Sequence, residues 1–167
     1  MKSPPLLSAL LAVAVAVSAP SAHAALGGSP MVLSFTDEAL TVRTERRMAN
    51  ARALDSGDAA TAAGFSVRET TLSSGTVVRE YLDSNGTVFG VAWQGPVKPN
   101  LVDLLGSYFH QFSAGVREYR AAHGVRAPVA INSDTLVVRM GGHMGSFSGQ
   151  AWLPSALPSG VTGTAIQ

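Results

Sequence analysis

Residues able to do chemistry gather near the end of the chain, where His143 precedes two serines. The segment 145–149 is Gly-Ser-Phe-Ser-Gly, which has the outline of the G-x-S-x-G turn that carries a nucleophilic serine. Its central residue is Phe147, however, and neither serine falls where that pattern requires one. Such a turn also joins a strand to a helix, whereas this segment has the composition of a strand. We therefore expect small residues beside a turn here, and no nucleophile.

The other histidines and the acidic loops do not complete a metal-binding motif. His110, His123 and His143 have no second histidine at helical ligand spacing, and no H-E-x-x-H occurs. The loop 83–86, Asp-Ser-Asn-Gly, begins like a calcium loop, but its glycine stands fourth instead of sixth. Gln94 occupies the twelfth position, where an EF-hand needs glutamate. The sequence thus assigns no catalytic, cofactor-binding or metal-binding residue.

One enzymatic arrangement stays open, that of a small hydrolase or lyase. In it His143 acts with Glu80, with Glu69 or with a serine near 146–148. Distance along the sequence does not exclude this grouping, because members of a catalytic triad meet only in the fold. The alternative, which we favour, is that His143 is a structural or surface residue beside a glycine turn.

The strongest structural pattern lies between residues 65 and 93. Three runs rich in Val, Thr and aromatic residues are separated by turn-forming residues at 73–75 and 83–86. This pattern predicts a three-stranded antiparallel meander. Its strands are Phe65–Leu72, Thr76–Leu82 and Thr87–Trp93.

Charge pairing fixes the register of this meander. Three-residue loops at 73–75 and 84–86 place Arg68 opposite Glu80 and Glu69 opposite Arg79, whereas a shorter first loop would oppose two glutamates. One face of the sheet then holds the aromatic and aliphatic residues Phe65, Val67, Val77, Tyr81, Phe89, Val91 and Trp93.

The Glu69–Arg79 pair falls on this aromatic face, and two interpretations of it are open. The pair is either a polar anchor at the rim of a pocket lined by Tyr81 and Trp93, or a structural pair where the helix leaves the sheet uncovered. We favour the structural interpretation, although a partly buried ion pair pays a desolvation cost that can exceed its Coulomb gain.

An amphipathic helix follows the meander. Asn100 is its expected N-cap, Asp103 stands at N3 as in a relaxed capping box, and Gly124 is the expected stop. Apolar residues recur at spacings of three and four, which predicts a helix that covers the aromatic face of the sheet. They are Leu101, Leu104, Leu105, Tyr108, Phe109 and Phe112.

The remaining strands predict a second β unit. Val129–Ile131 is a short strand, and Leu136–Met140 and His143–Trp152 flank the turn signal Gly141-Gly142. The expected fold class is therefore α+β: a three-stranded antiparallel meander packed on one amphipathic helix, followed by a C-terminal β-hairpin.

The first 24 residues have the pattern of a cleaved signal peptide. Lys2 gives the positive start, and the apolar run 6–19 is too short to cross a bilayer as a stable helix. Ala22-His23-Ala24 matches the small-x-small cleavage site. We expect a mature protein that begins at Ala25 and is periplasmic or secreted.

The rest of the chain divides into three parts. Residues 25–64 form an N-terminal segment with a helix from Thr36 to about residue 54 and a connection up to residue 64. Residues 65–153 form the α+β core domain. Residues 154–167 form a loose C-terminal tail, in which Leu157 or Val161 could dock on the core.

Composition excludes several classes of protein. Without Lys2 the chain has eleven basic and eleven acidic residues, a balance poorly suited to gripping nucleic acid. The absence of cysteine excludes a lipoprotein anchor, a disulfide scaffold and thiol catalysis. No apolar run beyond residue 19 approaches membrane-spanning length, so we expect no membrane span after cleavage.

Several short motifs point together to a known family. They are Val-Arg-Glu-Tyr at 78–81, Val-Phe-Gly-Val-Ala-Trp-Gln-Gly-Pro at 88–96, Leu-Leu-Gly-Ser-Tyr-Phe at 104–109, Gly-His-Met at 142–144 and Ala-Leu-Gly-Gly at 25–28. The sequence resembles, over essentially all of the mature chain, an exported bacterial family catalogued as domain of unknown function 2844. The resemblance implies a Gram-negative envelope or secreted protein, and it carries no established activity or catalytic residue.

Three classes of function remain open. The leading hypothesis is a non-enzymatic exported module that binds an envelope protein or ligand, with an exposed edge strand at Phe65–Leu72 or His143–Trp152 as one means of recruiting a partner strand. The second is the hydrolase or lyase built on His143. The third is a stress or matrix protein with no single site. Oligomeric state and the identity of the ligand or partner are not determined by the sequence.

Overall fold

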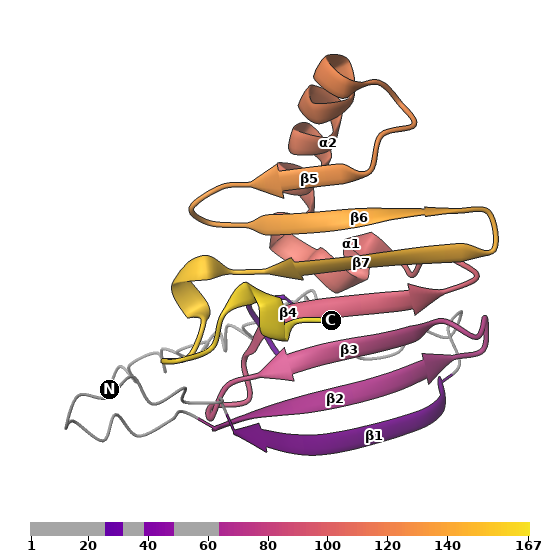
Figure 1. Ribbon diagram of the computed structural model, residues 1–167. Coiled ribbons are helices and arrows are strands. Elements are labelled where there is room, and N and C mark those ends of the chain that lie inside the picture. The colour runs from indigo at the N-terminus through magenta and orange to yellow at the C-terminus, as the bar shows by residue number, and fades with distance from the viewer. Residues whose placement is uncertain (1–25, 32–38, 49–63) are drawn as a thin grey trace, which may run out of the picture.

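The computed structural model describes residues 26–31, 39–48 and 64–167, and these are organised around one antiparallel sheet (Figure 1). The sheet has seven strands in the order β1-β2-β3-β4-β7-β6-β5. The strands are β1 (Ala39–Met48), β2 (Gly64–Leu72), β3 (Val77–Leu82), β4 (Val88–Gly95), β5 (Val129–Asn132), β6 (Val137–His143) and β7 (Ser146–Trp152).

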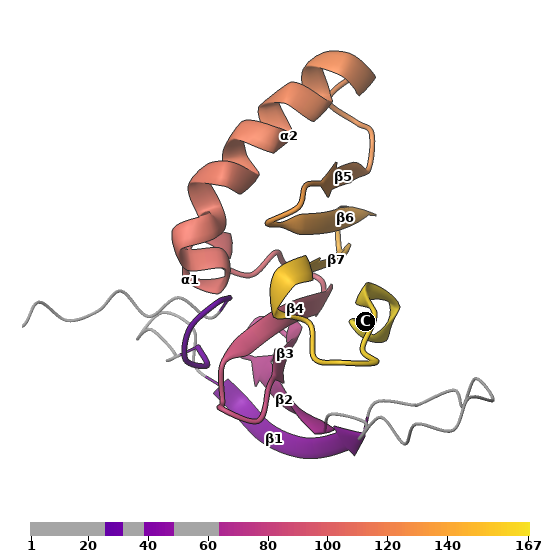
Figure 2. The ribbon, with the colours of Figure 1, turned by 90° about the vertical axis from the view of Figure 1, so that its left-hand side faces the viewer.

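Two helices cover one face of this sheet, and the C-terminal segment lies on the other (Figure 2). A short helix α1 (Leu101–Leu105) continues through the 3-10 turn Gly106–Tyr108 into α2 (Phe109–His123). The C-terminal segment contains two further 3-10 turns, Pro154–Ala156 and Gly163–Ala165. In the described part of the chain, no helix has the length and apolar character needed to span a membrane.

The caps of the helical segment are those that the sequence predicts. The Asn100 side chain accepts a hydrogen bond from the Val102 amide at 3.1 Å and donates one to Asp103 at 2.7 Å. Gly124 ends α2 with φ +87°, a left-handed conformation that favours glycine. Phe109 packs against the cluster that contains Trp93, so the helix and this tryptophan lie on the same side of the sheet, as expected. The expectation that the helix covers the aromatic face is otherwise wrong, because Phe65 and Tyr81 belong to the cluster on the other side.

The expected fold class is wrong in its architecture, because the meander and the C-terminal hairpin are parts of one sheet. Strand β4 pairs with β7, from Gly90 opposite Trp152 to Gly95 opposite Phe147. Six successive residues of β4 are buried, as in a central strand covered on both faces. The edges of the described sheet are therefore β1 and β5, and neither β2 nor β7 has the free edge that we expected.

The expected N-terminal helix is also wrong where it can be compared. Residues 39–48 form strand β1, which pairs with β2 and places Arg43 opposite Glu69 and Thr44 opposite Arg68. The segment contains Thr41, Val42 and Thr44, whose β-branched side chains favour a strand. The rest of the predicted helix, and the predicted connection over 56–63, lie outside the described residues.

The register of the first hairpin is confirmed, and that of the second is only partly correct. Arg68 lies opposite Glu80 and Glu69 opposite Arg79. In the second hairpin Leu82 lies opposite Val88 as expected, but a bulge at Phe89 then moves Gly90 opposite Tyr81. An extra residue in one strand reverses the direction of every later side chain.

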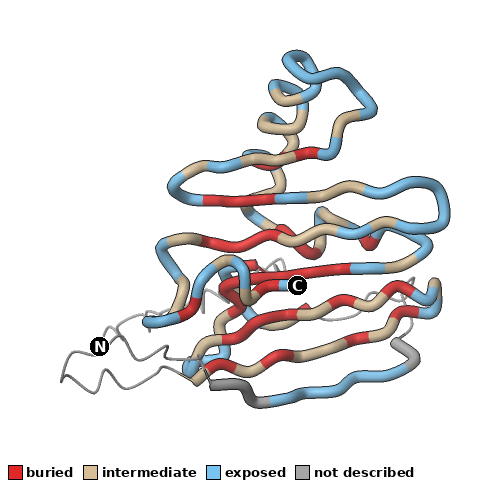
Figure 3. The backbone as a smooth tube through the Cα atoms, viewed as in Figure 1, coloured by how far each residue is buried: buried red, intermediate tan, exposed pale blue. Residues whose placement is uncertain are grey.

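This bulge corrects the predicted aromatic face. Val91 and Trp93 turn to the helix side, whereas Phe89 stays with Phe65 and Tyr81 on the opposite side, with ring centroids 6.0 to 6.3 Å apart. The sheet therefore has an apolar cluster on each face, and the buried residues concentrate in its inner strands (Figure 3).

The turn between β6 and β7 is displaced from the predicted one. His143 pairs with Ser146, so the turn is Met144-Gly145 and not Gly141-Gly142. Gly142 has φ +121°, and a Cβ there would collide with the backbone of Ser146. Gly142 thus allows close approach of the two strands near the turn, and neither glycine forms the turn itself.

The packing of Trp93 over Gly149 of the neighbouring strand gives a test of this sheet. A Cβ at Gly149 would collide with the indole ring, whereas one at Gly141 would make an ordinary contact with Pro128 at 3.5 Å. We expect Gly149→Ala to lower the free energy of unfolding by about 1–3 kcal/mol, because overpacking displaces the ring. The matched Gly141→Ala should stay within about 0.5 kcal/mol of the wild type. Urea unfolding measures both, and equal effects would contradict the β4–β7 pairing.

Candidate functional site

The sheet face opposite the helices is covered over only part of its area. Val161 and Ile166 of the C-terminal segment are buried in a cluster with Phe65, Tyr81 and other residues of the sheet. The expectation that Val161 docks is therefore correct, whereas the description of this segment as a loose tail is wrong for its last residues. The last of them is fastened, because the Gln167 amide donates to the Tyr81 hydroxyl at 2.9 Å.

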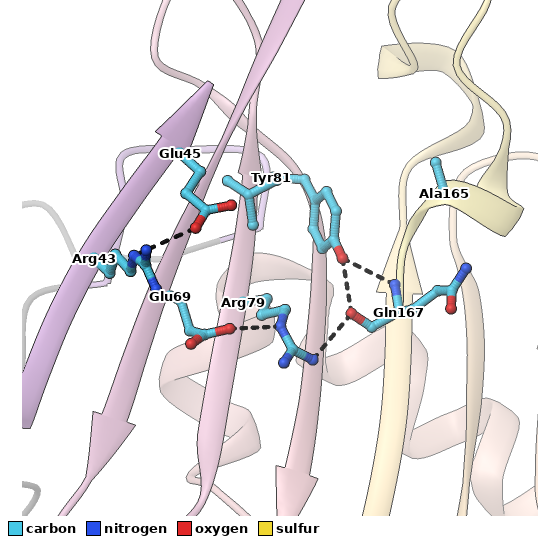
Figure 4. A pocket seen from close by; sticks show the side chains of 8 residues that line it. Arg43, Glu45, Glu69, Arg79, Tyr81, Ala165 and Gln167 are labelled. Atoms are coloured by element: carbon cyan, nitrogen blue, oxygen red, sulfur yellow. Dashed lines mark hydrogen bonds and ion pairs between the residues drawn. The ribbon is translucent and has the colours of Figure 1, made fainter. Parts of the chain in front are cut away.

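Beside the C-terminal segment the sheet is hollowed over β1, β2 and β3. This first hollow has a volume of about 380 Å³ and contains two ion pairs (Figure 4). Arg79 Nε donates to Glu69 Oε2 at 2.8 Å, and Arg43 Nε lies 3.3 Å from Glu45 Oε1. Its lining residues are Arg43, Glu45, Val67, Glu69, Arg79, Tyr81, Ala165 and Gln167.

The Glu69–Arg79 pair was predicted from the register, and both of its interpretations describe part of what is found. It lies on the face that the helices do not cover, and Tyr81 lines the hollow beside it. The side chain of Trp93 belongs instead to the helix-face core. Arg79 Nη1 also donates to the Gln167 carbonyl at 3.3 Å, so the pair helps to fasten the C-terminal segment as well as line the hollow.

A second hollow continues across β4, β7 and β6 and has a volume of about 480 Å³. It shares Arg79 and Gln167 with the first hollow, so the two hollows adjoin there, and together they are called the polar depression. Its other lining residues include Gln94, Pro128, Ala130, Arg139, Ser148 and Gln150.

The strand pairing places the polar residues of the second hollow in rows. Arg79 lies opposite Ala92, Ala92 opposite Gln150, and Gln150 opposite Arg139, so the two arginines stand three strands apart. Neighbouring strands are about 4.8 Å apart, which separates the two arginine backbones by about 14 Å. The depression is therefore long enough for an extended ligand.

Arg139 differs from Arg79 in its partners. Its guanidinium lies over the Trp152 ring, 5.5 Å from the centroid, and has no hydrogen bond or ion pair with any described residue. Sequence reasoning missed Arg139, although a charged residue between Val138 and Met140 in an otherwise apolar run indicates a side chain on the open face of a strand.

The hydrolase arrangement proposed around His143 is not assembled. His143 is exposed beside the β6–β7 turn, where its Nδ1 lies 3.1 Å from the Met144 carbonyl oxygen. Ser146 is its register partner, but Glu69 and Glu80 belong to strands on the other side of β4. No group of three or more His, Asp or Glu residues within the described ranges is placed to hold a metal ion.

Glu80, another residue of that arrangement, is fully buried on the helix face. Its Oε1 accepts a hydrogen bond from the Met31 amide at 2.6 Å, and its Oε2 lies 3.4 Å from Arg68 Nη1. Arg68 Nη1 also donates to the Met31 carbonyl at 3.1 Å. The carboxylate and the guanidinium together fasten residues 26–31 to the sheet.

Burial raises the pKa of the Glu80 carboxyl above its ordinary value of 4.5, and the Met31 hydrogen bond and the Arg68 charge offset part of this effect. Because the pKa is raised, the folded chain holds the proton more strongly than the unfolded chain does. The resulting stabilisation is complete below the unfolded pKa and is lost as the pH rises through the folded pKa.

Glu80→Gln provides the reference for measuring this effect, because its amide keeps the oxygen that accepts from Met31 but does not titrate. We expect the stability of the wild type relative to Glu80→Gln to fall as the pH rises from about 4.5 towards neutrality. Urea unfolding of both proteins at a series of pH values measures the difference. A difference that stays constant with pH, or grows as the pH rises, would contradict the effect of burial.

This sheet, with helices on one face and a polar depression on the other, belongs to a chain that matches a family over nearly its whole length. The match covers residues 22–166, and the chain belongs to the family described as protein of unknown function (DUF2844). Comparisons with curated proteins and with solved structures find no match.

Proposed function

We propose that the protein is an exported ligand-binding module of the cell envelope, and that its ligand lies in the polar depression formed by the two hollows. One observation carries this proposal: the C-terminal segment covers part of a sheet face and leaves beside it two adjoining hollows lined by charged and amide side chains. Ligand sites are typically concave, largely preformed and several hundred Å³ in volume.

The floor of the depression suits binding because it is rigid. It consists of paired strands, and those under the second hollow pack their opposite face against α1 and α2, so the positions of the side chains are fixed by the sheet. A preformed surface of this kind loses little conformational entropy when a ligand binds. The wall is rigid too, since Tyr81 and Arg79 both bond to Gln167.

The Glu69–Arg79 ion pair also supports a binding role. Each of its side chains is about one-third exposed, at 39% and 32%, so the pair is neither solvated surface nor sealed core. An ion pair that only held the sheet together could be replaced by apolar side chains without loss of stability. At the junction of the two hollows, the same charges are available to a polar ligand.

The export part of the proposal comes from the leader pattern. Cleavage after Ala24 would leave the docked residues 26–31 intact, among which Leu26 is buried and its amide donates to the Leu104 carbonyl at 3.1 Å. The segment that would remain is thus part of the packed structure.

Export predicts a shortened protein outside the cytoplasm. We expect mass spectrometry of the protein from periplasmic or culture fractions to show an N-terminus at Ala25, because Ala22-His23-Ala24 matches the cleavage pattern. Replacing Ala24 with Arg should block processing and leave the full-length chain with the membranes. An intact leader on wild-type protein in the cytosol would contradict export.

The binding site can be tested by filling the depression. Ser148 is exposed on β7 within the second hollow, and Ser107 is exposed in the turn between the helices. We expect wild type and Ser107→Trp to retain the same small molecule from an envelope extract, detected by native mass spectrometry, and Ser148→Trp to lose it because the indole occupies the hollow.

Thermal unfolding of the three proteins in buffer provides the control for folding. A ligand retained equally by Ser148→Trp would place binding elsewhere on the protein. The absence of any retained molecule on the wild type, together with no thermal shift on adding the extract, would count against ligand binding itself.

A further inference from the structure

We infer that the ligand of the second hollow is an acidic saccharide, with a carboxylate bound by Arg139 and with hydroxyl groups bound along the row towards Arg79. This inference rests on the proposed function and adds the class of the ligand. It follows from three properties of the hollow: its charge, its hydrogen-bonding groups and its apolar edge.

The charge of the second hollow selects an anion. Arg79 and Arg139 are its charged lining residues, and no carboxylate side chain lines it. Arg79 is neutralised by Glu69 in the adjoining hollow, whereas Arg139 has no ion-pair partner among the described residues. An arginine offers a planar fork of donors that matches a carboxylate in a bidentate manner.

Arg139 is also held in position before a ligand arrives. Its guanidinium carbon lies 5.5 Å from the centroid of the Trp152 ring, and the indole is itself buried at 7% exposure. A cation held over an aromatic ring keeps its N–H groups available at its edge. Less side-chain entropy is therefore lost when the carboxylate binds than with a freely moving arginine.

The groups between the two arginines favour hydroxyls over a purely ionic ligand. Gln94, Ser148 and Gln150 line this part of the hollow. Amide and hydroxyl side chains both donate and accept hydrogen bonds, as the hydroxyl groups of a saccharide do. A simple inorganic anion accepts hydrogen bonds only, so it would use the N–H groups of the two glutamines and make no bond to their carbonyl oxygens.

The edge of the hollow next to β5 is apolar. Pro128 and Ala130 line it there. The C–H face of a sugar ring can pack against such residues while its hydroxyls point to the amides, whereas an acidic peptide has no such division of faces on its charged side chains. The length of the hollow and its volume of about 480 Å³ suit several linked rings.

The inference is tested with defined probes on the full chain: trigalacturonate as acidic saccharide, maltotriose as neutral saccharide, triglutamate as acidic peptide and sodium sulfate as simple anion. We expect trigalacturonate to bind, by calorimetry, at least about tenfold more tightly than the other three. Its binding should shift the amide NMR signals of Ala92 and Gln150 on the floor of the hollow.

Variants of the anchor are compared with a matched change elsewhere. Arg139→Gln should weaken trigalacturonate about tenfold or more, as expected for the loss of a charged hydrogen-bonding partner. Arg117→Gln, an exposed arginine on α2, should leave binding unchanged. Arg139→Gln also removes the contact between Arg139 and Trp152. Ser148→Asp keeps this contact and adds a negative charge to the hollow, so it should also weaken trigalacturonate binding. Ser107→Asp is the control for this second variant.

The outcomes separate this inference from the proposed function. If maltotriose bound as tightly as trigalacturonate, the charge of the ligand would have no role. If triglutamate or sulfate bound as tightly, the ligand would not need to be a saccharide. Binding that is unaffected by both Arg139→Gln and Ser148→Asp would overturn the site. If a ligand from the extract shifts the amide signals of the floor while trigalacturonate does not, the inference fails and the proposed function stands. If neither the extract nor trigalacturonate shifts these signals, the inference and the proposed function both fail.

Discussion

The pairing of β4 with β7 is the constraint on which the rest of this structure depends. It joins two antiparallel units that are far apart in the sequence into one sheet, and it makes β4 a central strand with both faces covered. Two apolar clusters follow from it, one under α1 and α2 and one under the C-terminal segment. Glycines at Gly90 and Gly149 make this close packing possible, because a Cβ at either would collide with Ile166 or Trp93.

The candidate site is a consequence of how the second face is covered. The helices lie behind β5, β6 and β7, whereas the C-terminal segment is short and covers only the aromatic part of the opposite face. The uncovered part carries polar side chains from four strands, as suits a solvated sheet face. They are Arg79, Gln94, Arg139, Ser148 and Gln150. The result is a polar depression whose floor is fixed by the sheet and whose wall is the C-terminal segment.

Local chemistry made part of this structure predictable. The turn residues and the charge pairs Arg68–Glu80 and Glu69–Arg79 determine the first hairpin, and Asn100 and Gly124 mark the ends of the helical segment. These features depend on neighbours in the sequence, where propensity and pairing rules apply. The bulge at Phe89 has no such signal in the sequence. Because the predicted strand lacked this one extra residue, the prediction placed Val91 and Trp93 on the wrong face of the sheet.

Features that depend on distant partners were not predictable in this way. The pairing of β4 with β7 joins segments whose patterns are each compatible with a separate hairpin, and β1 has charges that also suit a helix surface. Within the candidate site, the Glu69–Arg79 pair was foreseen from the register. Arg139 and Gln167 were not, because their place beside Arg79 exists only once the sheet is complete and the chain has returned across it.

Two adjacent residues of β3 hold segments from opposite ends of the described chain. Glu80 bonds to residue Met31 on the helix side, and Tyr81 bonds to Gln167 on the other side. Since side chains alternate along a strand, a slip of β3 by one position would exchange these two attachments, bringing a carboxylate beneath Ile166 and a phenol among the leucines of α1. The hydrogen bonds to Met31 and to Gln167 therefore both depend on the alignment of β3. If β3 were shifted by one residue, neither hydrogen bond could form.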